Sequence, residues 1–153
     1  MTDIASELQT ILTEFVQARD LGLVIGSHKA TFTLSQGDKP EATLTASIAF
    51  VQRARVPPVG SPERRGPWRF PPDLAVEISS PKQTKEAMRA KTRQWLVGGV
   101  RLVWVVWPQP RQIEIWQPLP GLWTPTVLNI GDRLDGMEVL PEFSLPLGDL
   151  FLL

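Results

Sequence analysis

Hydrophobic residues recur with two different periods in the first fifty residues of the chain. Between residues 6 and 18 they show the three- and four-residue spacing of an amphipathic helix, for which Ser6 would open a capping box. From 44 to 51 larger apolar residues alternate with small or polar ones, which predicts a strand. Two short apolar runs, 23–27 and 29–34, predict further strands. We therefore expect a helix followed by an antiparallel meander.

The second half of the chain carries a strand–helix–strand pattern. Residues 74–79 and 100–107 are apolar and β-rich, and the helical segment 81–97 between them ends at two glycines. Such a unit is expected to cross over with a right hand. Short strands are predicted at 113–116 and 122–128. The predicted fold class is α/β, as a single domain over residues 1–153 with a central mixed β-sheet flanked by helices.

Composition limits the cellular locations and the kinds of binding site expected for this domain. The 153 residues include no cysteine, so disulfides and thiolate metal sites are excluded and a reducing, cytoplasmic location is expected. The acidic start MTDIASEL lacks the apolar core of a secretory signal. The longest apolar run contains Arg101 and is too short to span a bilayer, so no membrane association is predicted. No phosphate-binding glycine motif is present, and no small-molecule cofactor is expected.

Basic residues concentrate in the middle of a chain whose net charge is zero. Between residues 52 and 93 there are ten Lys or Arg against four acids, a surplus of six. The proline-rich stretch 52–72 reads as a long connection. Two interpretations stay open for it: a solvated loop, or a surface that contacts nucleic-acid phosphates. The candidate phosphate contacts are its five arginines, Arg53, Arg55, Arg64, Arg65 and Arg69.

One acid and one amine stand out in the strand–helix–strand unit. Odd-numbered positions of a strand share one face, which places Glu77 opposite its apolar neighbours. Lys91 lies three residues after Met88 and four before Trp95, along the apolar stripe of the helix. Alone, Glu77 could be a rim carboxylate and Lys91 could extend into water. Because burying both charges is costly unless they pair or hold a metal, we expect them to meet.

The segments PDLAVEISSP, RAKTRQWLVGGVRLVWVV and GDRLDGMEVLPEFSLPL resemble the Uma-two family, which belongs to the PD-(D/E)XK nuclease superfamily. The likeness covers most of the chain and implies a restriction-endonuclease-like core. It implies hydrolysis of DNA phosphodiester bonds with Mg²⁺ or Mn²⁺. By this resemblance Glu77 is the metal ligand and Lys91 the catalytic lysine. The superfamily places that lysine two residues after the glutamate, where this chain has Ser79, and the family has moved it to the helix.

One residue departs from the pattern that the resemblance implies. Ser47 stands where the family has a metal-binding aspartate, and a neutral hydroxyl is a weak Mg²⁺ ligand, so the metal should bind weakly. Asp73 is a poor substitute, because four strand residues separate it from Glu77 by roughly 13 Å. It is expected to be accessory, as are Ser47 and Ser79. Glu14 or Glu7, at the margin of the apolar stripe of the first helix, is expected to supply a further accessory carboxylate, although the match to the superfamily's helix glutamate is loose.

Two other functions remain open beside the endonuclease. The loss of the aspartate suggests a non-cutting relative that binds nucleic acid or protein. A homodimeric module is the second alternative, which the family resemblance favours. In that module Trp104, Trp107 and Trp116 would contribute to the interface, with Trp107 as an exposed anchor. The lone His28, at a predicted turn, is expected to have no catalytic role.

Overall fold

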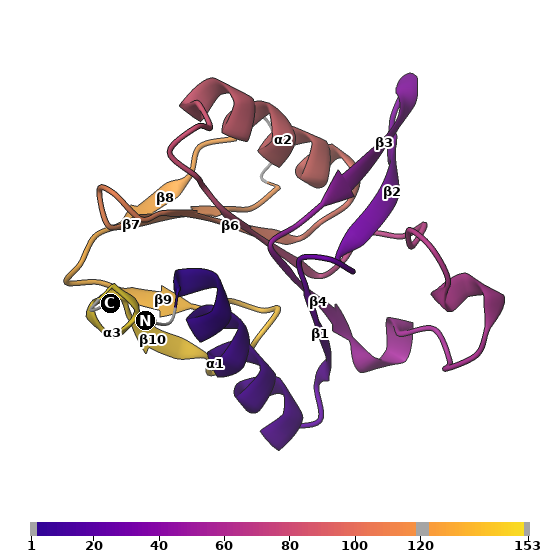
Figure 1. The fold of residues 1–153 in the computed structure, drawn as a ribbon, viewed down its shortest axis with the longest axis horizontal. Coiled ribbons are helices and arrows are strands. Elements are labelled where there is room, and N and C mark those ends of the chain that lie inside the picture. Colours follow the sequence, from indigo (N-terminus) through magenta and orange to yellow (C-terminus); the bar gives the residue numbers. More distant parts are fainter. Residues whose placement is uncertain (1–2, 119–122, 152–153) are drawn as a thin grey trace.

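A six-stranded mixed sheet forms the centre of the molecule (Figure 1). The structure is a computed structural model that describes residues 3–118 and 123–151. The sheet order is β1-β4-β5-β6-β7-β8, and β5–β6 is its parallel pair. Its strands are β1 (Gly22–Gly26), β4 (Ile48–Gln52), β5 (Leu74–Ile78), β6 (Leu102–Trp107), β7 (Gln112–Trp116) and β8 (Thr126–Leu128). Helix α2 (Lys85–Val97) connects the two parallel strands, as the sequence predicts.

The two faces of the sheet are covered by different elements. Helix α1 (Ile4–Ala18) packs on one face, near the short helix α3 (Leu147–Leu150) and the β9–β10 pair (Arg133–Asp135 and Ser144–Pro146) (Figure 1). Helix α2 and the β2–β3 hairpin (Thr31–Gln36 and Lys39–Thr45) cover the other. Alternate residues of β5 therefore enter separate cores. Leu74 and Val76 lie against α1, whereas Ala75 lies on the side of α2.

Coverage of both faces explains the composition of β6. All six of its residues are buried, which is why the segment reads as an unbroken apolar run rather than an alternating one. The expectation of an exposed Trp107 is wrong, because only 8% of it is accessible. Trp104 and Trp116 are also buried, at 0% and 5%. These three rings fill the two cores and are unavailable as interface anchors, and the predicted homodimer stays a prediction.

Several predicted boundaries are corrected. Helix α1 begins at Ile4, and its N-cap is Asp3, whose Oδ1 accepts a hydrogen bond from the Ser6 amide 2.7 Å away, so the predicted Ser6 cap is wrong. Helix α2 begins at Lys85 rather than at 81, with Thr84 as its cap. Residues 81 and 82 form a turn instead, in which the Gln83 side chain accepts a hydrogen bond from the Ser80 amide at 2.9 Å.

The expected meander is also wrong. The predicted strand 44–51 is divided at residues 46 and 47 into β3 and β4. Strand β4 pairs with β1 in the central sheet, whereas β2 and β3 form a separate hairpin. A single alternating run therefore serves two sheets, since side-chain period alone does not say where a strand changes partner. No helix among the described residues is long and apolar enough to cross a membrane.

Candidate active site

Glu77 and Lys91 meet beneath helix α2, as the sequence predicts. Glu77 lies near the end of β5 on the face that α2 covers, and it is 3% exposed. The Lys91 Nζ lies 3.0 Å from its Oε2 and 3.2 Å from its Oε1. Nζ also donates to the Thr45 carbonyl oxygen at 2.7 Å. One ammonium group thus links α2, β5 and the end of the β2–β3 hairpin.

Trp95 completes this arrangement, and sequence reasoning placed it on the right helical stripe without giving it a polar role. Its indole Nε1 donates a 2.7 Å hydrogen bond to Glu77 Oε2, and the ring is fully buried. A tryptophan four residues after Lys91 on the same helical stripe is the signal that was available, because a buried indole N–H requires an acceptor. Both oxygens of Glu77 therefore accept from protein donors.

Burial raises the pKa of the Glu77 carboxyl above its ordinary value of 4.5. The Lys91 charge and the hydrogen bonds from Trp95 and Lys91 act in the opposite direction, but they do not fully offset the loss of solvation. Glu77 is therefore a carboxylate whose ionised form depends on its two donors. This electrostatic dependence makes the trio of Glu77, Lys91 and Trp95 one unit.

Ser47 lies directly before β4 and beside the end of β5, where the family resemblance expects the aspartate. Its Oγ accepts a hydrogen bond from the Ile78 amide at 3.1 Å, and its own amide donates to the Val76 carbonyl at 2.9 Å. These bonds extend the pairing between β4 and β5 to Ser47, one residue before β4 begins. The hydroxyl thus stabilises the sheet edge and adds no negative charge to the site.

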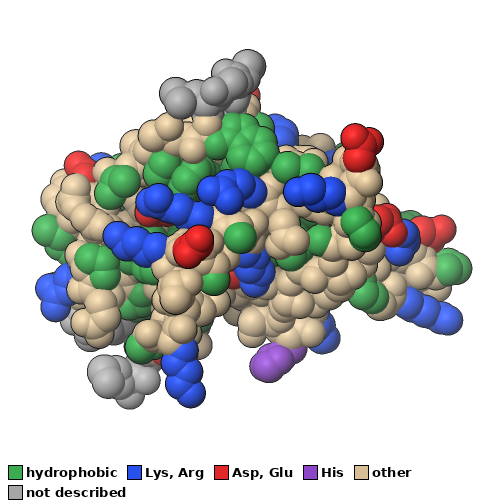
Figure 2. Space-filling view, turned by 90° about the horizontal axis from the view of Figure 1, so that it is seen from above, with side chains coloured by type: hydrophobic (Ala, Val, Ile, Leu, Met, Phe, Trp, Pro, Cys, Tyr) green, Lys and Arg blue, Asp and Glu red, His purple; other side chains and the backbone are tan. Residues whose placement is uncertain are grey.

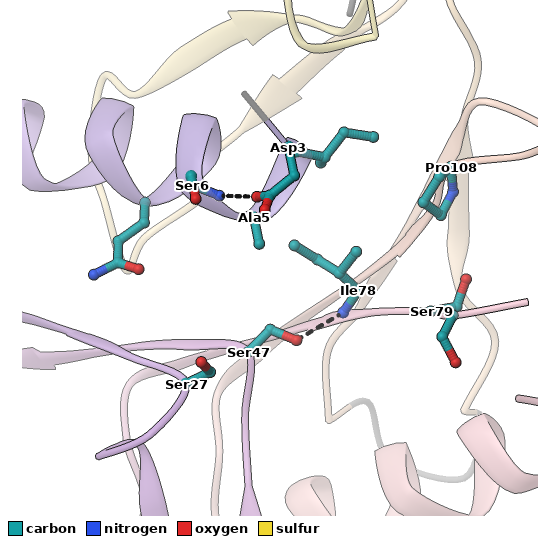
Figure 3. Close-up of a pocket in the computed structure, with 11 residues that line it drawn as sticks. Asp3, Ala5, Ser6, Ser27, Ser47, Ile78, Ser79 and Pro108 are labelled. Carbon is teal, nitrogen blue, oxygen red and sulfur yellow. Dashed lines mark hydrogen bonds between the residues drawn. The ribbon is translucent and has the colours of Figure 1, made fainter. Parts of the chain in front are cut away.

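A cavity of about 730 Å³ opens at the same edge of the sheet, between the start of α1 and the ends of β5 and β6 (Figure 3). Ser27, Ser47 and Ser79 contribute hydroxyl groups to its wall, and Gln9 contributes an amide. Glu77 and Lys91 are not among its lining residues, because they lie under α2. Figure 3 shows Ser47 bonded to the backbone of Ile78, with Ser79 just beyond the end of β5.

The donor set at this edge does not fit a magnesium ion. Mg²⁺ takes oxygen ligands, with one or two carboxylates as its usual protein contribution. Here Ser47, at the position where the resemblance expects an aspartate, has its Oγ bonded to Ile78, and both oxygens of Glu77 face donors. Over residues 3–118 and 123–151, no three His, Cys, Asp or Glu side chains gather as a group that could hold a metal.

The structure does not bring Asp73 to this site. Asp73 lies before the opposite end of β5, where it is 1% exposed. Its Oδ1 lies 2.8 Å from Arg55 and 2.9 Å from Arg101, and its Oδ2 accepts from the Gln52 amide at 2.8 Å. The interpretation of Asp73 as a strand-entry residue is consistent with this geometry. It anchors the 53–72 connection to the sheet.

The other predicted accessory residues lie apart from the site as well. Glu14 is exposed on α1, across the sheet from the buried Glu77. Within the 53–72 connection, Arg53 pairs with Asp20 at 2.6 Å, and Arg69 pairs with Glu41 at 2.8 Å. Arg64 donates to the Pro57 carbonyl. Arg65 is exposed. The connection is thus pinned by its own arginines, and its contact with phosphate stays a prediction.

A second buried glutamate repeats the local pattern with weaker contacts. Glu114 on β7 is 6% exposed and accepts from the Trp116 indole at 3.0 Å. Its cation is Arg89 of α2, at 3.8 Å. Sequence reasoning missed this residue, although it alternates with apolar neighbours as Glu77 does. It offers a matched comparison for Glu77 within the same sheet.

A mixed sheet covered on both faces, with an acid and a lysine meeting beside the end of a central strand, agrees with the restriction-endonuclease-like core that the family resemblance implies. The Uma2 family, described as "Putative restriction endonuclease", matches residues 2–148. The chain belongs to this family. Its fold is similar to the crystal structure of a "putative nuclease belonging to DUF820 from Anabaena variabilis ATCC 29413", with a TM-score of 0.81.

That likeness extends over 97% of this chain and 78% of the other, at 18% sequence identity. At this identity it establishes the fold and leaves the chemistry to be argued from the residues present. None of the curated proteins compared with the chain matches it. The fold and family predicted from the sequence are therefore confirmed.

Proposed function

We propose that this protein is a nuclease-family domain that binds nucleic acid and does not hydrolyse it at the Glu77 site. One observation carries the proposal. Glu77 is engaged on both oxygens by Lys91 and Trp95, and the neighbouring Ser47, where the resemblance expects a second carboxylate, is neutral. A site whose single carboxylate is already bound to two protein donors has little negative charge left for a divalent cation. Nucleic acid is the partner because the family is one of nucleases.

Metal-dependent endonuclease activity is the second candidate. The observation that favours it is the meeting of Glu77 with Lys91, since the family resemblance assigns these two residues to the metal and to catalysis. Such activity would require Lys91 to leave Glu77, which would expose a carboxylate that is 3% accessible. The two candidates therefore differ in whether the trio opens, and a cleavage assay separates them.

The test is an incubation of purified protein with supercoiled plasmid and labelled single-stranded DNA, in Mg²⁺ or Mn²⁺. We expect no metal-dependent product from the parent protein but salt-sensitive binding of the DNA. Ser47→Asp restores the missing carboxylate and is expected to gain Mn²⁺ affinity, measured by calorimetry. Ser47→Asn is the matched control, because it has nearly the same shape without the charge.

Cleavage by the parent that disappears in Glu77→Gln would establish the endonuclease instead. Circular dichroism must show that this variant is folded for the comparison to count. Cleavage that persists unchanged in Glu77→Gln identifies a contaminating nuclease. A parent protein that neither cuts nor binds DNA would overturn the proposed function altogether.

A further inference from the structure

A second concave surface lies away from the Glu77 site. It is a groove of about 670 Å³ between α2 and the β2–β3 hairpin. The hairpin contributes Lys39 and Pro40, and α2 contributes Arg93 and Val97. Trp123 lies in its wall as well. Among the described residues that line it there are two cations and no carboxylate, so the groove favours a negatively charged occupant.

Trp123 differs from every other tryptophan of the chain. It is 38% exposed, whereas the other five are at most 8% exposed. Val97, in the same groove, is 46% exposed. A large aromatic ring left partly in water beside an apolar side chain is not required by the core of this fold. A flat partner that covers the ring would recover the free energy of its burial.

Cations extend along the outer face of α2 beside this groove. Lys85, Arg89 and Arg93 follow one another at four-residue spacing, a rise of about 6 Å between neighbours. Figure 2 views the molecule from the α2 side and shows Lys and Arg side chains in a band across this face. Arg89 is 3.8 Å from Glu114, and within the described parts of the chain Lys85 and Arg93 have no carboxylate within 4.0 Å.

We propose that this groove and the outer face of α2 bind single-stranded nucleic acid. A base stacks on Trp123, and Lys39 and Arg93 contact the flanking phosphates. Base stacking on an aromatic side chain requires an unpaired base, which is why a single strand fits and a duplex does not. The proposal rests on the nucleic-acid binding proposed above, and it places that binding on α2 rather than on the 53–72 arginines.

The first measurement is tryptophan emission during titration with short oligothymidylate or oligouridylate. Because the other five tryptophans are buried, quenching that reports stacking must come from Trp123. We expect quenching in the parent protein and its loss in Trp123→Phe. Trp123→Ala should weaken binding by about 5- to 160-fold, the range seen for one stacked base. Quenching that persists unchanged in Trp123→Phe overturns the proposal. Quenching by either oligonucleotide supports it, and the stronger one identifies DNA or RNA as the preferred strand.

The second measurement compares two variants that each lose two positive charges. Lys39→Gln/Arg93→Gln removes the groove cations, and Arg53→Gln/Arg69→Gln removes two exposed arginines of the connection. We expect the groove variant to bind labelled oligothymidylate about tenfold more weakly. Its slope of log affinity against log salt should fall by about 1.4, at about 0.7 per phosphate contact. The connection variant should stay within about twofold of the parent.

The outcomes separate this inference from the proposed function. Equal weakening in both variants, or equally tight binding of polyglutamate, shows that general electrostatics suffices and overturns the groove. A parent that binds DNA while the groove variant binds equally well places the surface elsewhere, and the proposed function survives. A parent that binds no strand overturns both.

Discussion

Replacement of Lys91 by methionine isolates the electrostatic contribution of the buried pair. Methionine preserves most of the length and apolar volume of the lysine stem and removes its ammonium group. Glu77 would keep the Trp95 hydrogen bond at Oε2 and lose two contacts, at 3.0 and 3.2 Å. The Thr45 carbonyl would lose its 2.7 Å donor. A carboxylate that is 3% exposed is then left without its counter-charge.

The expected loss follows from this burial. Breaking a fully buried ion pair by removing one partner costs about 3–5 kcal/mol. The Lys91 side chain is 28% exposed, so in the variant water can reach the place of the ammonium group and partly solvate the Glu77 carboxylate. We therefore expect the free energy of unfolding to fall by about 3 kcal/mol at pH 8, the lower end of that range.

The loss should depend on pH with a definite sign. The pKa of Glu77 is raised in the folded protein, so between 4.5 and that raised value the folded state binds more protons than the unfolded state. Stability from this group is then complete below 4.5 and declines as pH rises through the raised pKa. Removing Lys91 removes a charge that lowers the pKa, which extends the window upward. The difference between parent and variant should therefore shrink as pH falls towards 5, by up to about 1.4 kcal/mol per unit.

Urea unfolding followed by circular dichroism at pH 5 and pH 8 measures this difference. Arg89→Met is the matched control, because the α2 cation that it removes is 46% exposed and lies 3.8 Å from Glu114, so it should cost less than Lys91→Met. Glu77→Met/Lys91→Met removes both charges and should recover most of the loss. A Lys91→Met variant as stable as the parent at pH 8, or a loss that grows at pH 5, would refute the reasoning.

Two further predictions concern the architecture around the site. Asp73→Asn should lower the free energy of unfolding by about 2–4 kcal/mol and make the 53–72 connection sensitive to trypsin, because two arginines lose a buried counter-charge. Asp20→Asn is the control for an exposed ion pair, because the Asp20 side chain is 77% exposed. It should change the free energy of unfolding by less than about 1 kcal/mol. Gly22→Ala should cost about 3 kcal/mol in thermal unfolding, because its Cβ would lie 2.1 Å from the Val51 carbonyl oxygen. Gly131→Ala, with open space around it, should be nearly neutral, and equal losses in both would contradict the argument.

The meeting of Glu77 and Lys91 was predictable because both periods are local. The two-residue period of β5 assigned Glu77 to one face, and the helical stripe assigned Lys91 to the buried edge of α2. A helix that joins two neighbouring parallel strands by short connections packs on one face of their sheet, which brings the two side chains together. The contact between Trp95 and Glu77 was harder to foresee, since it depends on ring orientation. The pairing of Asp73 with Arg101 depends on the parallel register of β5 and β6.

The sequence by itself determined the family, the mixed sheet with its crossover helix, and the convergence of the acid and the amine. Local periodicity and motif spacing carry that information within a few turns or strands. Only the tertiary structure decided that the 44–51 run serves two sheets, that Trp107 is buried, and that both oxygens of Glu77 are engaged. These depend on partners distant in the chain, and packing selects among such partners by geometry that no local pattern records.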